Sequence, residues 1–284
     1  ESFGLIKEAI NDSIFPGAQV FISKGDKVLA NIGFGTLGYD VNSEKVNKNT
    51  IYDVASLTKV LSTTPIIMKF IEKKRLDIDY LISDFYEEYN TPNKRQITIR
   101  NLLTHTSGLK SYIEYYKYSD FDRNKVINDI VTQPLEYSKE SKTVYSDLGF
   151  ILLMDIIEKT TNSKLDHLSD KYLYKPLGMK NTFFNPPLEL NNNIAPTEND
   201  KYFRNKLLKG VVHDENAYLL DGISGHAGLF STAEDIGLYS KMLIDGGYYL
   251  GQRYFSQKII KEFTQRQDIT VGSDFALGWD TPSQ

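Results

Sequence analysis

Apolar residues recur with two different periods in the first part of the chain. In "FGLIKEAINDSI" they fall at helical spacing and stop before Pro16, which predicts a helix over roughly residues 2 to 13. The next segment, "AQVFISKGDKVLANIGFG", alternates apolar and polar residues on both sides of a Gly-Asp pair. Alternation of this kind around a turn predicts a β-hairpin.

The middle of the chain has a helical pattern, and the end returns to short apolar runs. Helical spacing begins at "SLTKVLSTTPIIMKFIEKKRL" and continues to about residue 180, with a long apolar helix starting near Asp147. Further on, "HAGLFSTAEDIGLYSKMLIDGG" predicts a short strand and then a helix that Ser231 or Thr232 could cap. The last segment, "DFALGWDTPSQ", has the pattern of a strand that is cut short.

This order of elements predicts an α+β fold. We expect an antiparallel sheet built from both termini, flanked by helices, with a mainly helical lobe inserted. The prediction is one domain over residues 1–284, with a sheet lobe at about 1–55 and 220–284 and a helical lobe at about 56–219. Active sites commonly lie in the cleft between two such lobes.

Composition excludes several classes of function. The 284 residues carry 33 basic and 37 acidic side chains, so the formal charge of -4 gives no reason to expect nucleic acid or an anionic membrane as a partner. The absence of cysteine excludes disulfides, thiolate zinc sites and cysteine nucleophiles. No apolar run approaches the roughly 18 residues of a membrane span. No leader precedes Glu1, although a signal peptide or anchor removed earlier would be compatible with the sequence.

A glycine-rich segment, "GFGTLG" at residues 33–38, matches the G-x-G-x-x-G pattern of dinucleotide-binding sites. Such a site places these glycines between a strand and a helix, because the pyrophosphate binds at the helix N-terminus. Here the polar "YDVNSEKVNKNT" follows, and it lacks a helical pattern. The segment is better explained as a strand end with a turn, and we expect no cofactor.

The pattern S-x-x-K occurs twice, at Ser56/Lys59 and at Ser107/Lys110, so spacing alone does not identify a site. If Asp53 caps the helix, Ser56 lies in its first turn, where it shares a face with Lys59 and free backbone N–H groups point at the site. Ser107 is followed directly by a glycine, which favours a helix end. A serine becomes a good nucleophile when a neighbouring base removes its proton, and a lysine amine can do this only when burial or nearby cations keep it neutral.

The tripeptide Tyr-Ser-Asp also occurs twice. Residues 118–120 lie in the polar stretch "YYKYSDFDRN", which is typical of a surface loop or helix start. Residues 145–147 directly precede the long apolar helix, so Tyr145 would stand on a packed element. A tyrosine fixed beside a lysine can accept the serine proton and later donate it to the leaving group. Asp147 could orient the pair or cap the helix, and both interpretations stay open.

Four segments occur in an order that resembles the serine β-lactamase and penicillin-binding protein superfamily. They are "SLTK" opening a helix, "LLTHTSGL" at residues 102–109, "YSD" at 145–147 and "GLFSTAEDI" at 228–236. The likeness is to the class C-related branch of esterases, D-alanyl-D-alanine carboxypeptidases and cell-wall amidases, and it spans residues from about 16 to 279. It implies the β-lactamase/transpeptidase-like fold.

The resemblance also implies catalytic roles. Ser56 would be the acyl-forming nucleophile, Lys59 its activating partner and Tyr145 the general base and acid. In this family the oxyanion hole uses the N–H of the nucleophile and a second N–H from a strand that carries Lys-Thr-Gly or His-Thr-Gly. Neither tripeptide occurs here, and "LGW" at residues 277–279 resembles the strand that normally precedes it. We therefore expect the third catalytic strand to lie after residue 284.

The stretch "VHDENAYLLDGISGHAGLF" at residues 212–230 narrows the resemblance. It is similar to the branch of N-acetylmuramoyl-L-alanine amidases of muropeptide recycling and of β-lactamase-like domains fused to β-N-acetylglucosaminidases. The residues that would line or support the substrate cleft are His213, Asp214, Glu215, Asn216, His226 and Gly228. A metal is not expected, because the spacing of the two histidines fits no compact ligand motif and the branch implies none. His226-Ala227-Gly228 could instead replace the missing H-x-G motif, although its place ahead of "LFSTAEDI" argues against this.

The sequence therefore predicts a serine hydrolase that forms an acyl-enzyme on an amide or ester bond, with a cell-wall muropeptide as the favoured substrate. His105, in "LLTHTSGL", is interpreted as a structural link between a helix end and a loop. A carboxylesterase or β-lactamase of the same fold is one alternative. The other is a non-catalytic penicillin-binding or sensor domain, because half of the oxyanion hole is unaccounted for. The family suggests an extracytoplasmic location in the bacterial cell envelope and a fused or neighbouring glycosidase domain.

Overall fold

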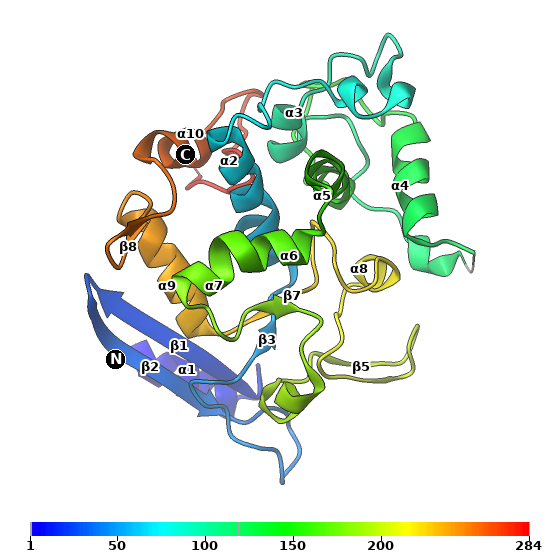
Figure 1. Cartoon of the computed structure of the whole chain (residues 1–284). Helices are drawn as coiled ribbons and strands as arrows, with labels where there is room; N and C mark the ends of the chain where they lie inside the picture. Colours follow the sequence, from blue (N-terminus) through cyan, green and yellow to red (C-terminus); the bar gives the residue numbers. More distant parts are fainter. Residues whose placement is uncertain (1, 119, 284) are drawn as a thin grey trace.

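Helices and short antiparallel sheets make up the computed structural model, which describes residues 2–118 and 120–283 (Figure 1). The α-helices are α1 (Ser2–Asn11), α2 (Thr64–Glu72), α3 (Ile99–Leu103), α4 (Arg123–Thr132), α5 (Asp147–Thr161), α6 (Leu165–Ser169), α7 (Lys175–Leu177), α8 (Glu215–Leu219), α9 (Ala233–Ile244) and α10 (Gln257–Thr264). The strands are β1 (Gly17–Lys24), β2 (Lys27–Gly35), β3 (Tyr52–Asp53), β4 (Phe183–Phe184), β5 (Glu198–Asp200), β6 (Lys206–Leu208), β7 (Leu229–Ser231), β8 (Tyr248–Tyr249) and β9 (Gln252–Arg253). These strands pair antiparallel. The predicted α+β fold class is confirmed.

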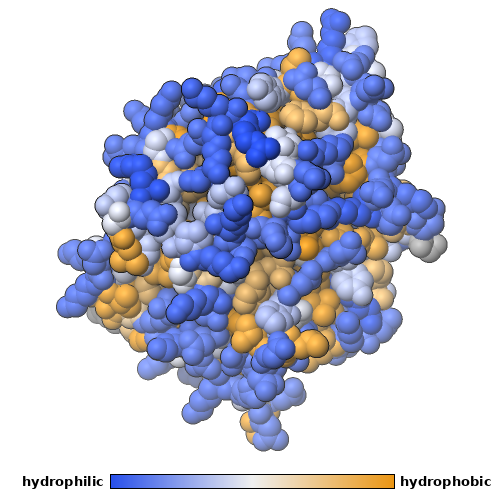
Figure 2. All heavy atoms as spheres, in the orientation of Figure 1, coloured by the Kyte–Doolittle hydropathy of each residue, from blue (hydrophilic) through white to orange (hydrophobic). Residues whose placement is uncertain are grey.

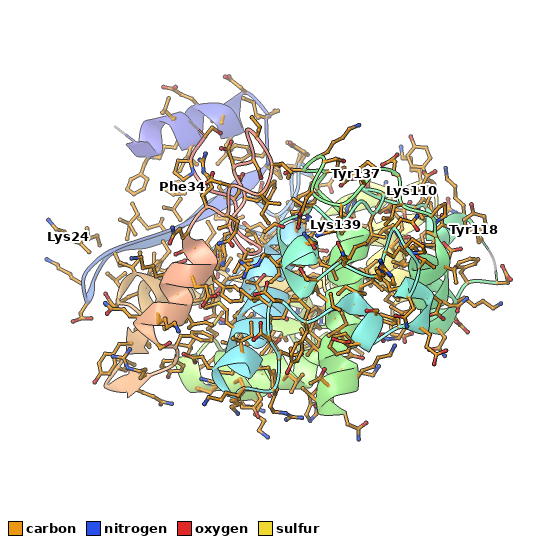
Figure 3. The ribbon with its side chains drawn as sticks, turned by 90° about the horizontal axis from the view of Figure 1, so that it is seen from above. Lys24, Phe34, Lys110, Tyr118, Tyr137 and Lys139 are labelled. Carbon is orange, nitrogen blue, oxygen red and sulfur yellow. The ribbon has the colours of Figure 1, made fainter. Side chains whose placement is uncertain are left out.

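The N-terminal hairpin of β1 and β2 has the predicted form. Gly25 turns the chain between the two strands with a φ of 56°, a conformation that favours glycine. The ring of Phe3 in α1 packs on Phe34 of β2, with 5.4 Å between the ring centroids. Figure 3 shows Phe34 next to α1 and Lys24 projecting from the free end of the hairpin. Because β2 ends at Gly35 without a following helix, the glycine-rich segment is a strand end.

The long helix α5 lies in the centre of the core. Ser146 caps its N-terminus by accepting a hydrogen bond from the backbone N–H of Gly149 at 3.3 Å, and Asn162 ends it in the left-handed conformation, with a φ of 52°. Its residues 148–154 are all fully buried. A helix that is apolar around most of its circumference packs inside the protein on several sides.

A three-stranded sheet in the order β3–β7–β4 brings two distant segments together. β3 pairs with β7, and just after β3 the N–H of Val54 donates to the carbonyl of Leu229 at 3.0 Å. At the end of β7, Thr232 accepts the N–H of Asp235 at 3.2 Å and so caps α9, one of the two caps predicted. The sheet therefore fixes where the chain leaves β3 toward residue 56.

The C-terminal segment differs from the strand that its pattern predicted. Among the described residues, it contains a single bridge between Phe275 and Asp280. Gly278 turns the chain with a φ of 83°, and its N–H donates to the carbonyl of Leu103 in α3 at 2.9 Å. The N–H of Leu277 donates to a carbonyl of α10 at 3.1 Å. The segment is thus fastened to two helices, and Figure 1 shows the C-terminus beside α10.

The face of the molecule seen in Figure 2 is mainly polar. Figure 2 shows one face on which hydrophilic residues predominate and apolar residues form scattered patches. Within residues 2–118 and 120–283, none of the helices has both the length and the apolar character needed to span a bilayer.

Gly225 provides a test of the packing beside α5. A Cβ at this position would collide with the carbonyl oxygen of Phe150 and crowd the side chain of Met154. We expect Gly225→Ala to lower the free energy of unfolding by about 1–3 kcal/mol in a denaturant titration, because the core has no room to move aside. The control is Gly4→Ala in α1, where a Cβ meets nothing within 4 Å, and it should stabilise by about 0.5–1 kcal/mol. Equal stability of the two variants would contradict this packing.

Candidate active site

The backbone before Ser56 is bent into a tight turn at the end of β3. Asp53 accepts the N–H of Ala55 on Oδ1 at 2.8 Å, and Ala55 has a φ of 46°. This left-handed conformation costs a residue with a Cβ about 1–2 kcal/mol. A 3₁₀ turn, η1 (Ala55–Leu57), follows, and then a π-helical turn, η2 (Lys59–Thr63), leads into α2. The exposed Ser56 therefore stands at the start of a helical segment, as the sequence predicted.

The amine of Lys59 is buried beside Ser56 and is surrounded by oxygen atoms. Its Nζ lies 3.0 Å from Ser56 Oγ, 2.7 Å from Asp147 Oδ1 and 3.2 Å from the backbone oxygen of His226. An ammonium group has three N–H bonds to donate, and these three acceptors match them. The Nζ also lies 4.5 Å from the centroid of the Tyr145 ring. The structure thus brings together the three residues predicted to be catalytic.

Asp147 orients Lys59 and does not cap α5. The cap is Ser146, while Asp147 is the first residue of the helix and forms an ion pair with the lysine. The side chains of Lys59 and Asp147 are 3% and 19% exposed, so water screens this pair only weakly. Of the two interpretations that the sequence left open, the geometry supports the first.

The second copies of the two sequence patterns lie in other surroundings. Ser107 is buried after the end of α3, and its Oγ accepts the N–H of Leu109 at 3.3 Å. The carbonyl of Lys110 accepts a hydrogen bond from Ser146 Oγ at 2.7 Å. Tyr118 is 53% exposed, and Ser119 lies outside the described residues. Neither copy is therefore a second candidate centre.

His105 braces Tyr145 from the core side. Its Nδ1 accepts the backbone N–H of Ser146 at 3.0 Å, and its ring lies 4.6 Å from the Tyr145 ring between centroids. Burial, and after it the charge of Lys59, lowers the pKa of His105 to about 3. A neutral histidine that links a helix end to the following segment agrees with the structural role expected from the sequence.

His226, whose backbone oxygen contacts the buried amine, is itself paired with Asp214. His226 donates from Nε2 to Asp214 Oδ1 at 2.8 Å, and its Nδ1 lies 2.7 Å from Ser224 Oγ. Burial raises the pKa of Asp214, but the charge and hydrogen bond of His226 outweigh it and bring the pKa down to about 2. Asp214 is therefore an anion at neutral pH. The residue before it, His213, donates its backbone N–H to Asp53.

The other residues predicted in this stretch have supporting positions. His213 contacts Asp53 through its backbone N–H at 2.7 Å, whereas its ring pairs with Glu198 at 2.6 Å near the surface. Asn216 is buried in α8 and donates to the carbonyl of Ile113 at 2.8 Å. Gly228 has a φ of 109° and passes close to the backbone of residue 222. In the part of the chain that the structure describes, no group of three or more histidine, aspartate or glutamate side chains is placed to hold a metal.

Comparison with known proteins identifies the family of this site. A family model described as Beta-lactamase matches residues 4–281. The chain belongs to the beta-lactamase family. A Bacillus subtilis (strain 168) protein named N-acetylmuramyl-L-alanine amidase is 32% identical over 296 residues, which cover 93% of this chain and 67% of that protein. An Escherichia coli O157:H7 protein named "Putative D-alanyl-D-alanine carboxypeptidase" is 32% identical over 302 residues, which cover 94% and 68%.

Solved structures have the same fold. The octameric penicillin-binding protein homologue from Pyrococcus abyssi matches with a TM-score of 0.76 at 24% identity, covering 97% of this chain and 63% of that one. The chain thus spans about two thirds of the length of these relatives. The predicted beta-lactamase family, its fold and a hydrolase of the serine type are confirmed.

Sequence reasoning missed one contact that shapes this beta-lactamase-family site. Thr58, inside the S-x-x-K pattern, donates from Oγ1 to the carbonyl of Ala55 at 2.6 Å and accepts the N–H of Leu229 at 3.1 Å. It therefore ties the strained turn to β7. A threonine between the serine and the lysine is the only sequence signal of this contact, and it carries no chemistry of its own.

The buried neutral His105 predicts how the stability of the protein depends on pH. Its pKa of about 3 is below the value near 6.5 expected in the unfolded chain, so the unfolded state takes up a proton first as the pH falls. Between about pH 6 and 3 this residue should remove about 1.4 kcal/mol from the free energy of unfolding for each pH unit. His105→Asn keeps an acceptor and tolerates the φ of 58° without titrating. Denaturant titrations should give a shallower pH slope for that variant, and equal slopes would contradict the assignment.

Proposed function

We propose that Ser56 attacks an amide or ester carbonyl and carries the acyl group, with Lys59 and Tyr145 as its partners. The observation that carries this proposal is the Lys59 Nζ, buried and 3.0 Å from the exposed Ser56 Oγ. A serine at the start of a helical segment, beside a fixed amine, has the arrangement needed for nucleophilic catalysis. The family assignment supports the same reading.

The contacts of Lys59 suggest how the proton moves. Three oxygen atoms around its amine hold the amine in place beside Ser56. We assign proton transfer to Tyr145, whose exposed ring lies next to the amine. As the bond from Ser56 Oγ to the carbonyl carbon forms, Ser56 gives its proton to the Tyr145 oxygen while Tyr145 gives its own proton to the leaving amine or alcohol, whose bond to the carbonyl carbon breaks. Water then cleaves the acyl-enzyme, and Lys59 stabilises the negative charge that develops during transfer.

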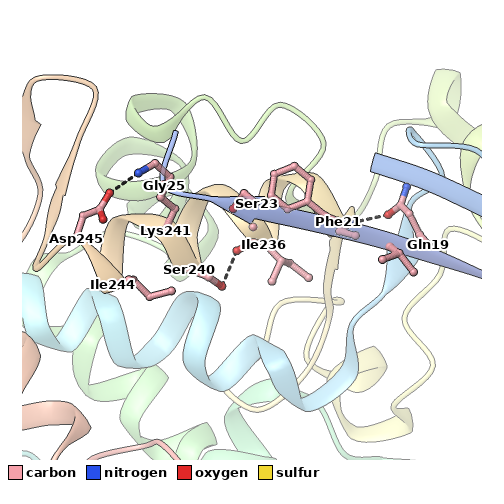
Figure 4. Close-up of a pocket in the computed structure, with 12 residues that line it drawn as sticks. Gln19, Phe21, Ser23, Gly25, Ile236, Ser240, Lys241, Ile244 and Asp245 are labelled. Atoms are coloured by element: carbon pink, nitrogen blue, oxygen red, sulfur yellow. Dashed lines mark hydrogen bonds and ion pairs between the residues drawn. The ribbon is translucent and has the colours of Figure 1, made fainter. Parts of the chain in front are cut away.

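Two adjoining pockets form a groove beside β1, which supports a proposal for the second half of the oxyanion hole. A pocket of 590 Å³ between β1 and α9 is lined by residues that include Phe21 and Ile236 (Figure 4). A second pocket of 250 Å³ shares Gln19 and Ile236 with it and reaches Val54, near the nucleophile turn. Among the described residues, β1 pairs with β2 alone. We propose that a strand carrying the third family motif occupies this groove and supplies the second N–H.

The favoured substrate is a peptidoglycan fragment with an amide bond. The amidase and carboxypeptidase names of the relatives support this choice, and they also support an extracytoplasmic location. We propose a muropeptide as the substrate. We also propose that a glycosidase domain is fused to this domain or acts beside it. A carboxylesterase, a β-lactamase and a non-catalytic sensor are the alternatives that experiments must distinguish.

The nucleophile can be tested with a fluorophosphonate probe, which labels activated serines. We expect wild-type protein to be labelled at Ser56 and Ser56→Ala to lose labelling and hydrolysis by at least about 10³-fold, because the attacking oxygen is gone. Ser107→Ala is the matched control from the second S-x-x-K pattern and should keep both. Mass spectrometry of the labelled peptide identifies the site. Undiminished labelling of Ser56→Ala would reject the assignment, and stable labelling without turnover of any substrate would favour the sensor.

The substrate class can be tested with three substrates measured side by side. They are a lactoyl-linked muropeptide, a p-nitrophenyl ester and nitrocefin. We expect the highest kcat/KM for the muropeptide, because binding contacts away from the reacting bond can lower the barrier of the correct substrate. Turnover of the ester alone would favour a carboxylesterase, and turnover of nitrocefin alone would favour a β-lactamase. The Ser56→Ala variant provides the background rate for each.

A further inference from the structure

A line of hydrogen bonds connects the turn before Ser56 to a loop far along the chain. The N–H of Ala55 donates to Asp53 Oδ1 at 2.8 Å, and the other oxygen of Asp53 accepts the N–H of His213 at 2.7 Å. One carboxylate thus holds two segments that are separated by more than a hundred residues. The next residue, Asp214, caps the N-terminus of α8.

Asp214 continues this line to the buried amine. Its Oδ1 accepts both the Nε2–H of His226 at 2.8 Å and the N–H of Ala217 at 2.7 Å. The backbone oxygen of His226 accepts a hydrogen bond from Lys59 Nζ at 3.2 Å, and the same Nζ donates to Ser56 at 3.0 Å. The contacts therefore form a closed ring. It starts at the turn before Ser56, passes through the 213–214 segment and His226 to Lys59, and returns to the Ser56 hydroxyl.

The His226 ring is buried, and both of its nitrogens form hydrogen bonds. His226 and Ser224 are 1% and 0% exposed, and both ring nitrogens of His226 have a partner. A hydrogen bond to a carboxylate is stronger than one between neutral groups. The peptide carbonyl of residue 226 cannot turn away from Lys59 unless a buried polar group loses its partner, which is costly.

We infer that Asp214 is a positioning residue, which acts through His226 to hold the carbonyl that places the Lys59 amine beside Ser56. The inference rests on the proposed function, in which Lys59 must stay next to Ser56 while the acyl bond forms. Without Asp214 the imidazole keeps only its contact with Ser224, the carbonyl of residue 226 moves, and the amine keeps its bonds to Asp147 and Ser56. A displacement of about 1 Å at a reacting pair can lower a rate by about 10²-fold.

The test compares three variants by the time course of fluorophosphonate labelling of Ser56. Asp214→Ala removes the acceptor, and we expect its labelling rate constant to fall at least about tenfold while the final extent stays that of the wild type. Asp214→Asn keeps an oxygen for His226 and should stay within about threefold. Asp122→Ala removes a similar aspartate cap from α4, where Asp122 accepts the N–H of Lys125 at 2.9 Å, and should label at the wild-type rate.

The rate constant separates positioning from stability. A purely structural role would lower the final extent of labelling in Asp214→Ala and leave the rate constant unchanged, and that result would overturn the inference. An equal fall in Asp122→Ala would also overturn it. If Asp214→Ala does not fold, Ser224→Ala releases the other ring nitrogen of His226 and should slow labelling in the same way.

Crystal structures of the wild type and Asp214→Ala give a readout that does not depend on catalysis. We expect the contact between Lys59 Nζ and the carbonyl of residue 226 to be lost in the variant. An unchanged contact would overturn the inference even if labelling slowed. If the wild type is not labelled at Ser56, the proposed function fails, whereas the comparison of the two structures still decides whether Asp214 positions Lys59.

Discussion

The burial of one amine, that of Lys59, is the constraint on which the rest of this site depends. A buried charge without partners is strongly unfavourable, so a lysine that is 3% exposed requires oxygen atoms on several sides. The oxygens come from Ser56, Asp147 and His226, which lie far apart in the sequence. The turn after β3, the start of α5 and the loop before β7 must therefore converge, and the apolar core around α5 keeps them in place.

Ser56, the proposed nucleophile, has the opposite requirement, because a nucleophile must be open to its substrate while its neighbours stay fixed. The chain meets this requirement with local strain. Ala55 has a φ of 46°, and the contacts of Asp53 and Thr58 hold it there. A π-helical turn follows, and irregular turns of this kind are frequent at functional sites. The cost of about 1–2 kcal/mol for the left-handed residue is offset by hydrogen bonds to buried segments on both sides.

Local sequence signals predicted the elements well, because a hairpin and a capped helix each depend on residues close together in the sequence, and the family motifs can be read in order along it. The signals could not decide between partners that meet only in three dimensions. From the sequence, Asp147 could either cap α5 or form an ion pair. In the structure Ser146 caps α5, and Asp147 pairs with Lys59 from a distant segment. The ring of His213 pairs with Glu198, which no local pattern indicates. The C-terminal segment alternates like a strand, but a turn and two helices provide its hydrogen-bond partners.

A buried arginine holds the loop before α8 from the side opposite Asp53. The side chain of Arg204 is 4% exposed, pairs with Asp200 at 2.7 Å, and donates to the carbonyls of Val212 and His213 at 2.7 Å each. Backbone N–H groups and Arg204 lower the pKa of Asp200, so this ion pair persists into acid. The hairpin of β5 and β6 is thereby fixed to the loop before α8. Arg204 therefore supports the same His213 backbone that Asp53 binds, and with it the loop from which Asp214 reaches His226, so the position of the Lys59 amine depends on contacts well outside its own surroundings.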